Sequence, residues 1–179
     1  VQWEVAGPVK DDFDRLQTGG VVPNWNVYSP KWCPVEIVDF PGFGKKSLAL
    51  KDKDPYDYAK AIRVFEKAEK QSVSFDLFVE SKSGILDIEV VSANGSRLIQ
   101  TRINNGFLNA RNGQTELKKL TQLESKNWYK LEIETNYKKK SFDLLLNGKE
   151  IAKSFKFAAK GEMPERIIFR TGDYRLTDD

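Results

Sequence analysis

Asparagine–glycine pairs and related turn signals recur between short alternating segments, and this spacing is the strongest constraint on the fold. Asn-Gly suits tight hairpin turns, because the central residues of such turns need a positive φ. Five signals of this kind occur in the chain: Lys82-Ser83-Gly84, Ala93-Asn94-Gly95-Ser96, Asn104-Asn105-Gly106, Asn112-Gly113 and Asn147-Gly148. Turns spaced by about 8 to 12 residues are typical of sandwiches. The pattern predicts an all-β fold, an antiparallel β-sandwich connected as a meander or Greek key.

The segments between the turns are predicted to be strands. Residues 127–151 alternate apolar and polar residues on both sides of a polar turn at residues 137–140, which predicts a β-hairpin. Residues 57–70 can be written as a short amphipathic helix or as a strand, and the apolar centre at Ile62 and Val64 favours the strand. The other predicted strands cover residues 35–39, 46–52, 72–80, 85–92, 98–103 and 166–170.

Alternation assigns one face of each strand to the core and the other face to the surface. The predicted core face carries Val73, Phe75, Leu77, Val79, Leu86, Ile88 and Val90. The opposite face carries polar and charged residues of both signs, namely Asp76, Glu80, Asp87, Glu89, Gln100, Arg102, Lys130, Glu132, Glu134 and Asp143. We expect this second face to be solvated strand surface or the polar floor of a groove.

Composition excludes several functional classes. Cys33 is the only cysteine and histidine is absent, so internal disulfides, Cys/His zinc sites, Ser-His-Asp triads and histidine bases are excluded. The net charge of +3 is too weak to indicate nucleic-acid binding, and no apolar run approaches the roughly 20 residues of a membrane span. With 179 residues, the chain is expected to hold one β-sandwich domain at residues 11–179, after a lead-in at residues 1–10 from a preceding domain.

Four stretches carry a resemblance to a known family: DDFDRLQTGGVVPNWNVYSP, GKKSLALKD, FDLLLNGKEI and ERIIFRTGDYR. They resemble the laminin G-like, concanavalin A-like jelly roll, in particular the version appended to bacterial sialidase-like glycosidases with BNR repeats. The resemblance covers most of residues 11–175. It implies two antiparallel sheets, a curved groove on one of them, frequent carbohydrate binding and, in many members, structural calcium.

Glycanases of this superfamily carry paired carboxylates on one strand face, and the nearest match here is GILDIEVV, with Asp87 and Glu89 two residues apart. Retaining hydrolysis needs two carboxyl groups separated by about 5 to 5.5 Å. Ile85 stands where the motif has its first glutamate, so the motif is incomplete. We therefore expect no catalytic residues in this chain.

A second acidic group, Asp52, Asp54 and Asp57, lies in the loop KDKDPYD. Calcium prefers several oxygen ligands at short range, whereas aspartates in turns commonly accept hydrogen bonds from nearby backbone N–H groups. The turn role is favoured, so no cofactor is expected, with structural calcium as the alternative.

Aromatic and arginine side chains supply the candidate sugar contacts. Tyr28, Trp32 and Tyr56 lie in proline-rich, loop-like sequence, and such rings stack on the C–H faces of sugars. For Trp25 and Trp32 taken singly, packing at the end of the sandwich is the favoured alternative. The other predicted carbohydrate-binding residues are Arg63, Asp87, Glu89 and Arg102. The arginines can hold an acidic sugar such as a uronate or pair with Asp87 and Glu89 across the sheet, and the pairing is favoured.

The leading hypothesis is a non-catalytic carbohydrate-binding or structural module of a larger bacterial glycan-degrading enzyme, secreted or periplasmic. Its expected partners are a polysaccharide or oligosaccharide and the catalytic domain of the parent chain, with no nucleic acid and no membrane. A stand-alone glycan-active enzyme and a purely structural or protein-interaction domain are the alternatives, because one fold hosts many functions.

Overall fold

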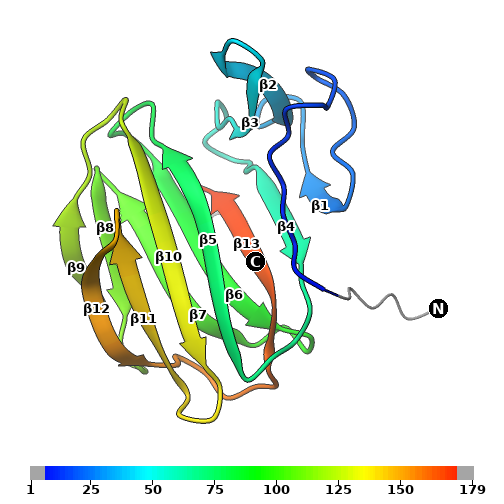
Figure 1. Cartoon of the computed structure of the whole chain (residues 1–179). Coiled ribbons are helices and arrows are strands. Elements are labelled where there is room, and N and C mark those ends of the chain that lie inside the picture. Colours follow the sequence, from blue (N-terminus) through cyan, green and yellow to red (C-terminus); the bar gives the residue numbers. More distant parts are fainter. Residues whose placement is uncertain (1–6, 173–179) are drawn as a thin grey trace. The chain divides into compact units, whose positions relative to one another are not determined.

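A computed structural model describes residues 7–172 of the chain, which form thirteen β-strands and no helix (Figure 1). None of the described segments is therefore a helix that could cross a membrane. The described chain divides into two compact units. The first unit contains residues 7–66 and 167–172, and the second unit contains Lys67–Arg166.

The second unit consists of two layers of antiparallel strands (Figure 1). In one layer the neighbours are, in order, β6 (Ile85–Ser92), β7 (Arg97–Asn104), β8 (Phe107–Arg111) and β9 (Leu117–Gln122). In the other layer they are β12 (Lys149–Lys156), β11 (Ser141–Leu146), β10 (Trp128–Asn136) and β5 (Lys70–Phe78). The predicted antiparallel β-sandwich is confirmed.

Two of the predicted Asn-Gly turns form as their chemistry requires. Asn147 and Gly148, between β11 and β12, have φ angles of 50° and 81°. Asn105 and Gly106, between β7 and β8, have φ angles of 49° and 78°. Positive φ at both central residues is the geometry whose twist matches the flanking strands.

Alternation places the apolar side chains of the second unit between its two layers. Ile88 and Leu108 of one layer, and Leu131, Ile133 and Leu144 of the other, have no exposed surface. The predicted hairpin is confirmed, since Leu131 lies opposite Leu146, and Ile133 opposite Leu144. Burial of such side chains is the main favourable contribution to folding.

Strands β9 and β12 are the last strands of their layers. Each presents exposed lysines: Lys118 and Lys119 on β9, and Lys149 and Lys153 on β12. Lysines at strand edges are a common feature of natural sheets.

The first unit contains two pairs of antiparallel strands and part of β13. Strand β1 (Trp25–Tyr28) pairs with β4 (Lys60–Val64), and β2 (Val35–Gly42) pairs with β3 (Lys45–Leu50). Strand β13 (Pro164–Thr171) belongs to this unit from Ile167 and lies beside β4. The core of the unit contains Cys33, Val35, Ala59 and Ala61, against which Trp25, Leu48 and Leu50 pack.

The structure also differs from the sequence-based prediction. Residues 57–70 contain strand β4 and no helix, as expected. Strands β1, β8 and β9 were not predicted, and β12 was predicted only in its first residues, as the end of the hairpin. Trp25 and Tyr28 lie in strand β1 and not in a loop. Residues 1–6 of the predicted lead-in lie outside the described residues, and the predicted domain boundary at residue 11 stays a prediction.

Candidate functional site

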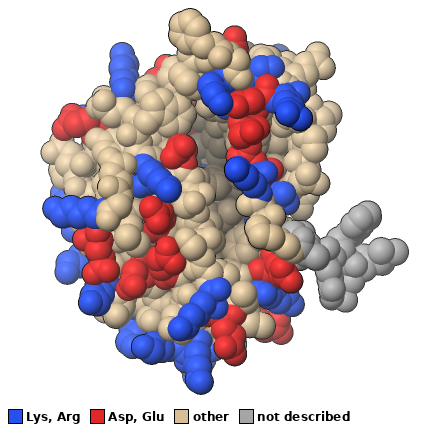
Figure 2. All heavy atoms as spheres, in the orientation of Figure 1, with Lys and Arg blue, Asp and Glu red and all other residues tan. Residues whose placement is uncertain are grey.

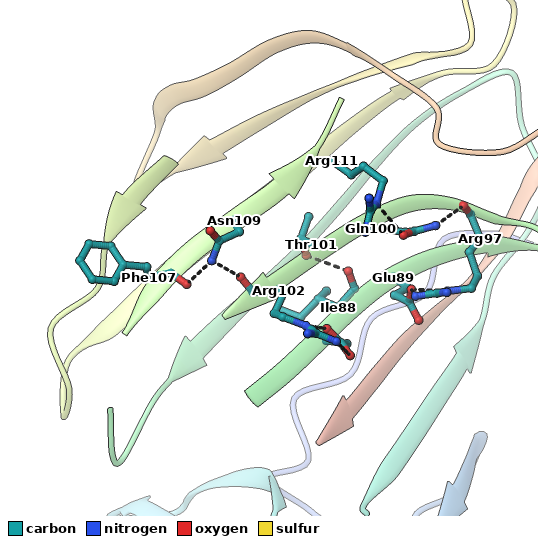
Figure 3. Close-up of polar contacts among 10 residues, drawn as sticks. Ile88, Glu89, Arg97, Gln100, Thr101, Arg102, Phe107, Asn109 and Arg111 are labelled. Atoms are coloured by element: carbon teal, nitrogen blue, oxygen red, sulfur yellow. Dashed lines mark hydrogen bonds and ion pairs between the residues drawn. The ribbon is translucent and has the colours of Figure 1, made fainter. Parts of the chain in front are cut away.

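A row of polar side chains covers the outer side of β6, β7 and β8 in the second unit. These side chains are Asp87 and Glu89 from β6, Arg97, Gln100 and Arg102 from β7, and Asn109 and Arg111 from β8 (Figure 3). Except for Arg97, they alternate with the buried Ile88, Val90, Thr101, Ile103, Leu108 and Ala110, so they point away from the core. Arg97 lies at a register shift of the β6–β7 pair, and its ion pair with Glu89 places it on the same side. We call this surface the polar face.

Asp87 and Arg102 form a doubly hydrogen-bonded pair on the polar face. They are opposite each other in the β6–β7 register. The Arg102 Nε donates to Asp87 Oδ1 at 2.6 Å, and the Arg102 Nη2 donates to Asp87 Oδ2 at 3.0 Å. Such a two-point contact fixes the plane of the guanidinium group as well as its position.

A second arginine pair lies one step along the strands. Arg97 donates its Nε to Glu89 Oε2 at 2.6 Å. Gln100, opposite Glu89 on β7, donates to the Arg97 carbonyl at 3.3 Å and accepts from Arg111 Nε at 3.0 Å. The side chains of three neighbouring strands are therefore joined in one hydrogen-bonded network (Figure 3).

The exposure of this network differs from the sequence-based expectation. Asp87 and Glu89 were expected on solvated strand surface, but only 3% and 1% of their surface is exposed. The side chains of Arg102 and Arg97 are 21% and 45% exposed. The accessible part of the pairs is therefore guanidinium and not carboxylate.

An aromatic ring and an amide extend the polar face along β8. The Asn109 Nδ2 donates to the Arg102 carbonyl at 3.2 Å and to the Phe107 carbonyl at 3.0 Å. Lys119 Nζ from β9 lies 4.0 Å from the centre of the half-buried Phe107 ring. This end of the face combines a cation, an amide and an aromatic surface.

Sequence reasoning missed the site residues on β8 and Arg97. The segment FLNAR between the two turn signals at Asn105-Gly106 and Asn112-Gly113 alternates apolar and polar residues, which would have predicted strand β8. That strand would then have placed Asn109 and Arg111 beside Arg102.

The predicted residues of the first unit form separate groups, and Tyr28 belongs to a pair of tyrosines. Its ring lies 4.7 Å from that of Tyr58, and its hydroxyl donates to Asp57 Oδ1 at 3.0 Å. This hydrogen bond to a carboxylate raises the pKa of Tyr28 above its ordinary value. Tyr28 is 42% exposed, so one side of the pair is accessible.

Trp32 and Tyr56 lie in two loops that are linked by hydrogen bonds of Cys33 and of the neighbouring backbone. The buried Cys33 Sγ donates to Asp52 Oδ1 at 3.4 Å, and Lys53 donates its backbone N–H to the Trp32 carbonyl at 3.0 Å. Burial raises the pKa of the Cys33 thiol. Trp32 is 56% exposed and Tyr56 is 83% exposed, so the packing role expected for Trp32 is wrong.

Trp25 has the packing role that was expected of it. Its ring lies 5.9 Å from that of Phe13 and 6.2 Å from that of Phe169. Aromatic pairs at these separations are favourable contacts. Trp25 and Trp32 therefore have different roles.

Arg63 is engaged in bonds that hold the first unit together. Its Nε donates to Asp11 Oδ2 at 2.8 Å, and its Nη1 donates to the carbonyl of Asn24 at 3.4 Å. The side chain is 14% exposed. The expected partners Asp87 and Glu89 are replaced by Asp11, whereas Arg102 does pair with Asp87 as predicted.

The three loop aspartates accept hydrogen bonds within their own unit. Asp52 accepts from Cys33, Asp54 accepts from the Tyr56 N–H at 2.9 Å, and Asp57 accepts from the Tyr58 N–H at 2.9 Å. These are the contacts of turn aspartates. Among residues 7–172, no group of three or more Cys, Asp or Glu side chains is arranged to hold a metal ion.

Hydrogen-bonding side chains on an outer sheet face, with exposed aromatic rings elsewhere, are the chemistry that sugars require, because sugars offer hydroxyls and apolar C–H faces. The fold and these surfaces define a β-sandwich of the carbohydrate-binding class. The sequence model of the family described as "Sialidase-like, CBM domain" matches residues 25–179. The chain belongs to this family of carbohydrate-binding modules of sialidase-like proteins, and the predicted carbohydrate-binding module is confirmed.

Solved structures with a similar fold include a sialidase with a TM-score of 0.84 and 30% sequence identity. The match covers 94% of this chain and 15% of the sialidase chain, so this chain spans a small part of that protein. A comparison with curated proteins finds no match.

Two more distant structures are also similar in part. Sheep galectin-11 in complex with glycerol has 13% identity and a TM-score of 0.47, over 62% of this chain and 88% of the galectin. A structure described as "Cell entry of botulinum neurotoxin type C is dependent upon interaction with two ganglioside molecules" has 14% identity and a TM-score of 0.49, over 83% of this chain and 38% of that one. Such values support neither a shared ligand nor a shared function.

Proposed function

We propose that this domain binds a sugar that carries a carboxylate, and that the polar face is the binding surface. The supporting observation is the arrangement of its ion pairs. Asp87 and Glu89 are buried, whereas the arginines that they hold are partly exposed, Arg102 to 21% and Arg97 to 45%. A ligand on this face meets guanidinium groups, which donate charge-assisted hydrogen bonds to carboxylates.

The buried carboxylates have a positioning role in this proposal. An arginine side chain has several rotatable bonds, and ordering it on binding reduces affinity. Asp87 holds Arg102 through two hydrogen bonds before any ligand arrives. The polar face is therefore organised in advance for an acidic sugar.

The exposed aromatic residues of the first unit are proposed as separate stacking contacts for sugar rings. Tyr28, Trp32 and Tyr56 each have 42% or more of their surface exposed. Arg63 is left out of the proposed contacts because Asp11 and a backbone carbonyl already hold it.

The wider setting is also a proposal. The resemblance to the laminin G-like, concanavalin A-like domains of bacterial BNR-repeat glycosidases supports a secreted or periplasmic parent enzyme. The parent's catalytic domain would act on the glycan that this module holds. Neither nucleic acid nor a membrane is proposed as a partner, in keeping with the net charge of +3.

The test is calorimetric titration of the 179-residue chain with two matched pairs of sugars: 3′-sialyllactose against lactose, and trigalacturonate against galactotriose. We expect at least one acidic sugar to bind with a dissociation constant of about micromolar to millimolar, and more weakly as salt is added. Equal binding of the acidic and neutral members of both pairs, or no binding of either acidic sugar, contradicts the proposal.

Two substitutions locate the site. Arg97→Gln removes a guanidinium group that is 45% exposed and should weaken acidic-sugar binding about tenfold. Arg102→Lys keeps the charge beside Asp87 but removes the two-point contact, and should also weaken binding. Lys138→Gln removes an equal charge from the exposed β10–β11 turn and serves as the matched control. Release of reducing sugar by the chain alone would instead support the enzyme hypothesis.

A further inference from the structure

The outer side of the other layer of the second unit contains a groove of about 440 Å³. It crosses β5, β10, β11 and β12 near the β10–β11 turn. Its lining is mixed in charge and rich in hydrogen-bonding groups, including Lys70, Ser72, Glu134, Lys139, Asp143 and Ser154. Figure 2 shows acidic side chains gathered over β10 and β11, with basic side chains around the turn that joins them. A volume of this size lies within the range of small-ligand sites.

Strand register brings the two carboxylates of the groove together. Glu134 on β10 lies opposite Asp143 on β11 and opposite Ser72 on β5. Cross-strand partners have their side chains on the same face, with Cβ atoms about 5 Å apart. Glu134 and Asp143 therefore stand side by side on the groove floor, and both are half-buried.

Each carboxylate is held by a neighbour of its own. Ser72 Oγ donates to Glu134 Oε1 at 2.9 Å. The backbone N–H of Ser154 donates to Asp143 Oδ1 at 2.6 Å. Within residues 7–172, neither carboxylate forms an ion pair, in contrast to Asp87 and Glu89 on the polar face.

An irregularity of the sheet opens one side of the groove. The register of β11 and β12 shifts between Phe142 and Leu144, at the position of Asp143. Ser154 at this point has a φ of 53°. Such bulges redirect side chains and often occur at functional surfaces.

We propose that this groove is a second sugar-binding site, separate from the polar face, and that it takes an uncharged sugar. Two carboxylates and two lysines give the lining no net charge, so neither an anionic nor a cationic ligand is favoured. Carboxylates accept strong hydrogen bonds from hydroxyl groups, and Lys70, Lys139 and the serines supply donors. Neighbouring hydroxyls of a neutral sugar ring present both donors and acceptors.

The same arrangement predicts weak and hydroxyl-dependent binding. The groove is open and lacks an exposed aromatic ring among its lining residues, so stacking does not contribute. Binding then depends on hydrogen bonds that replace bonds to water, and each of these has a small net value. A dissociation constant of about 1 mM is expected.

The experiment is an NMR titration of the 179-residue chain with four neutral trisaccharides: β-1,4-galactotriose, α-1,5-arabinotriose, β-1,4-mannotriose and maltotriose. For at least one probe, the backbone amide signals that shift should be those of Ser72, Glu134, Asp143 and Ser154. The isosteric double variant Glu134→Gln with Asp143→Asn should weaken this binding about fivefold to tenfold. Glu132→Gln is the matched control and should leave binding unchanged. Glu132 lies two residues from Glu134 on the same face of β10, but outside the groove lining.

Two results would overturn the inference. One is the absence of amide shifts at the groove with all four probes. The other is binding that persists unchanged in the double variant while that variant keeps its native spectrum. Arg97→Gln separates the two sites: it should leave neutral-sugar binding intact and weaken only acidic-sugar binding, so either site can fail without the other.

Discussion

The outer faces of the two layers of the second unit both carry carboxylates on neighbouring strands, but they expose different chemistry. On β6 and β7, Asp87 and Glu89 are buried and the arginines that bind them are partly exposed. On β10 and β11, the half-buried Glu134 and Asp143 line an open groove. Residue type alone therefore does not give the charge that a ligand meets, because it depends on which partner of a pair is accessible.

The largest predicted effect concerns the core that lies between these faces. Leu144→Ala removes a fully buried side chain behind the groove and should reduce the free energy of unfolding by about 2 to 5 kcal/mol. Glu132→Ala, on the outer side of neighbouring β10, should change it by less than about 0.5 kcal/mol. Urea denaturation monitored by tryptophan fluorescence provides the measurement. Equal losses in the two variants would show that the faces are assigned the wrong way round.

The second prediction compares the two kinds of carboxylate directly. Arg102→Met leaves buried Asp87 without its two-point contact and should cost about 3 kcal/mol, since a buried charge loses its counterion. Asp143→Ala in the groove loses a hydrogen bond to the Ser154 N–H and should cost only about 1 kcal/mol. Denaturation midpoints at neutral pH measure both, and a larger loss in Asp143→Ala would reverse the comparison.

Alternation and turn chemistry predicted much of the fold. The hairpin at residues 127–151 and the turn at Asn147-Gly148 formed as expected, because both depend on local backbone preferences. Strand β9 was missed because Lys118 and Lys119 interrupt the apolar–polar alternation of its short sequence. Edge strands obey the pattern less strictly, since fewer of their side chains reach a core.

The site was less predictable than the fold. Alternation correctly placed Asp87 and Arg102 on the same side of the sheet, and their pairing was foreseen. It did not give the burial of Asp87 and Glu89, because the period of a strand fixes the direction of a side chain and not its exposure. The opposite roles of Trp25 and Trp32 likewise depend on contacts between distant segments.

A third prediction applies the same question of exposure to the first unit. Trp32→Ala and Tyr56→Ala should weaken glycan binding but lower the melting temperature by less than about 2 °C, because both side chains are more than half exposed. Trp25→Ala removes contacts with Phe13 and Phe169 and should lower the melting temperature more. Differential scanning fluorimetry distinguishes these outcomes, and a larger loss in Trp32→Ala would assign that residue to packing.

The smallest predicted effect concerns calcium. A ligand that binds only the folded state raises the melting temperature by mass action. Because Asp52, Asp54 and Asp57 accept hydrogen bonds within their loop, we expect millimolar calcium to change the melting temperature by less than about 1 °C relative to chelator. A reproducible rise that Asp54→Asn abolishes would restore the calcium alternative.

The lysines of β9 and β12 bear on how the domain behaves at high concentration. An unpaired strand edge offers N–H and C=O groups to a second copy, which is the first step of sheet extension and fibril growth. Lys118, Lys119, Lys149 and Lys153 place like charges along both edges, so two copies that approach edge to edge repel each other. At high local density, the charge on these strand edges therefore disfavours joining of the two copies through their sheets.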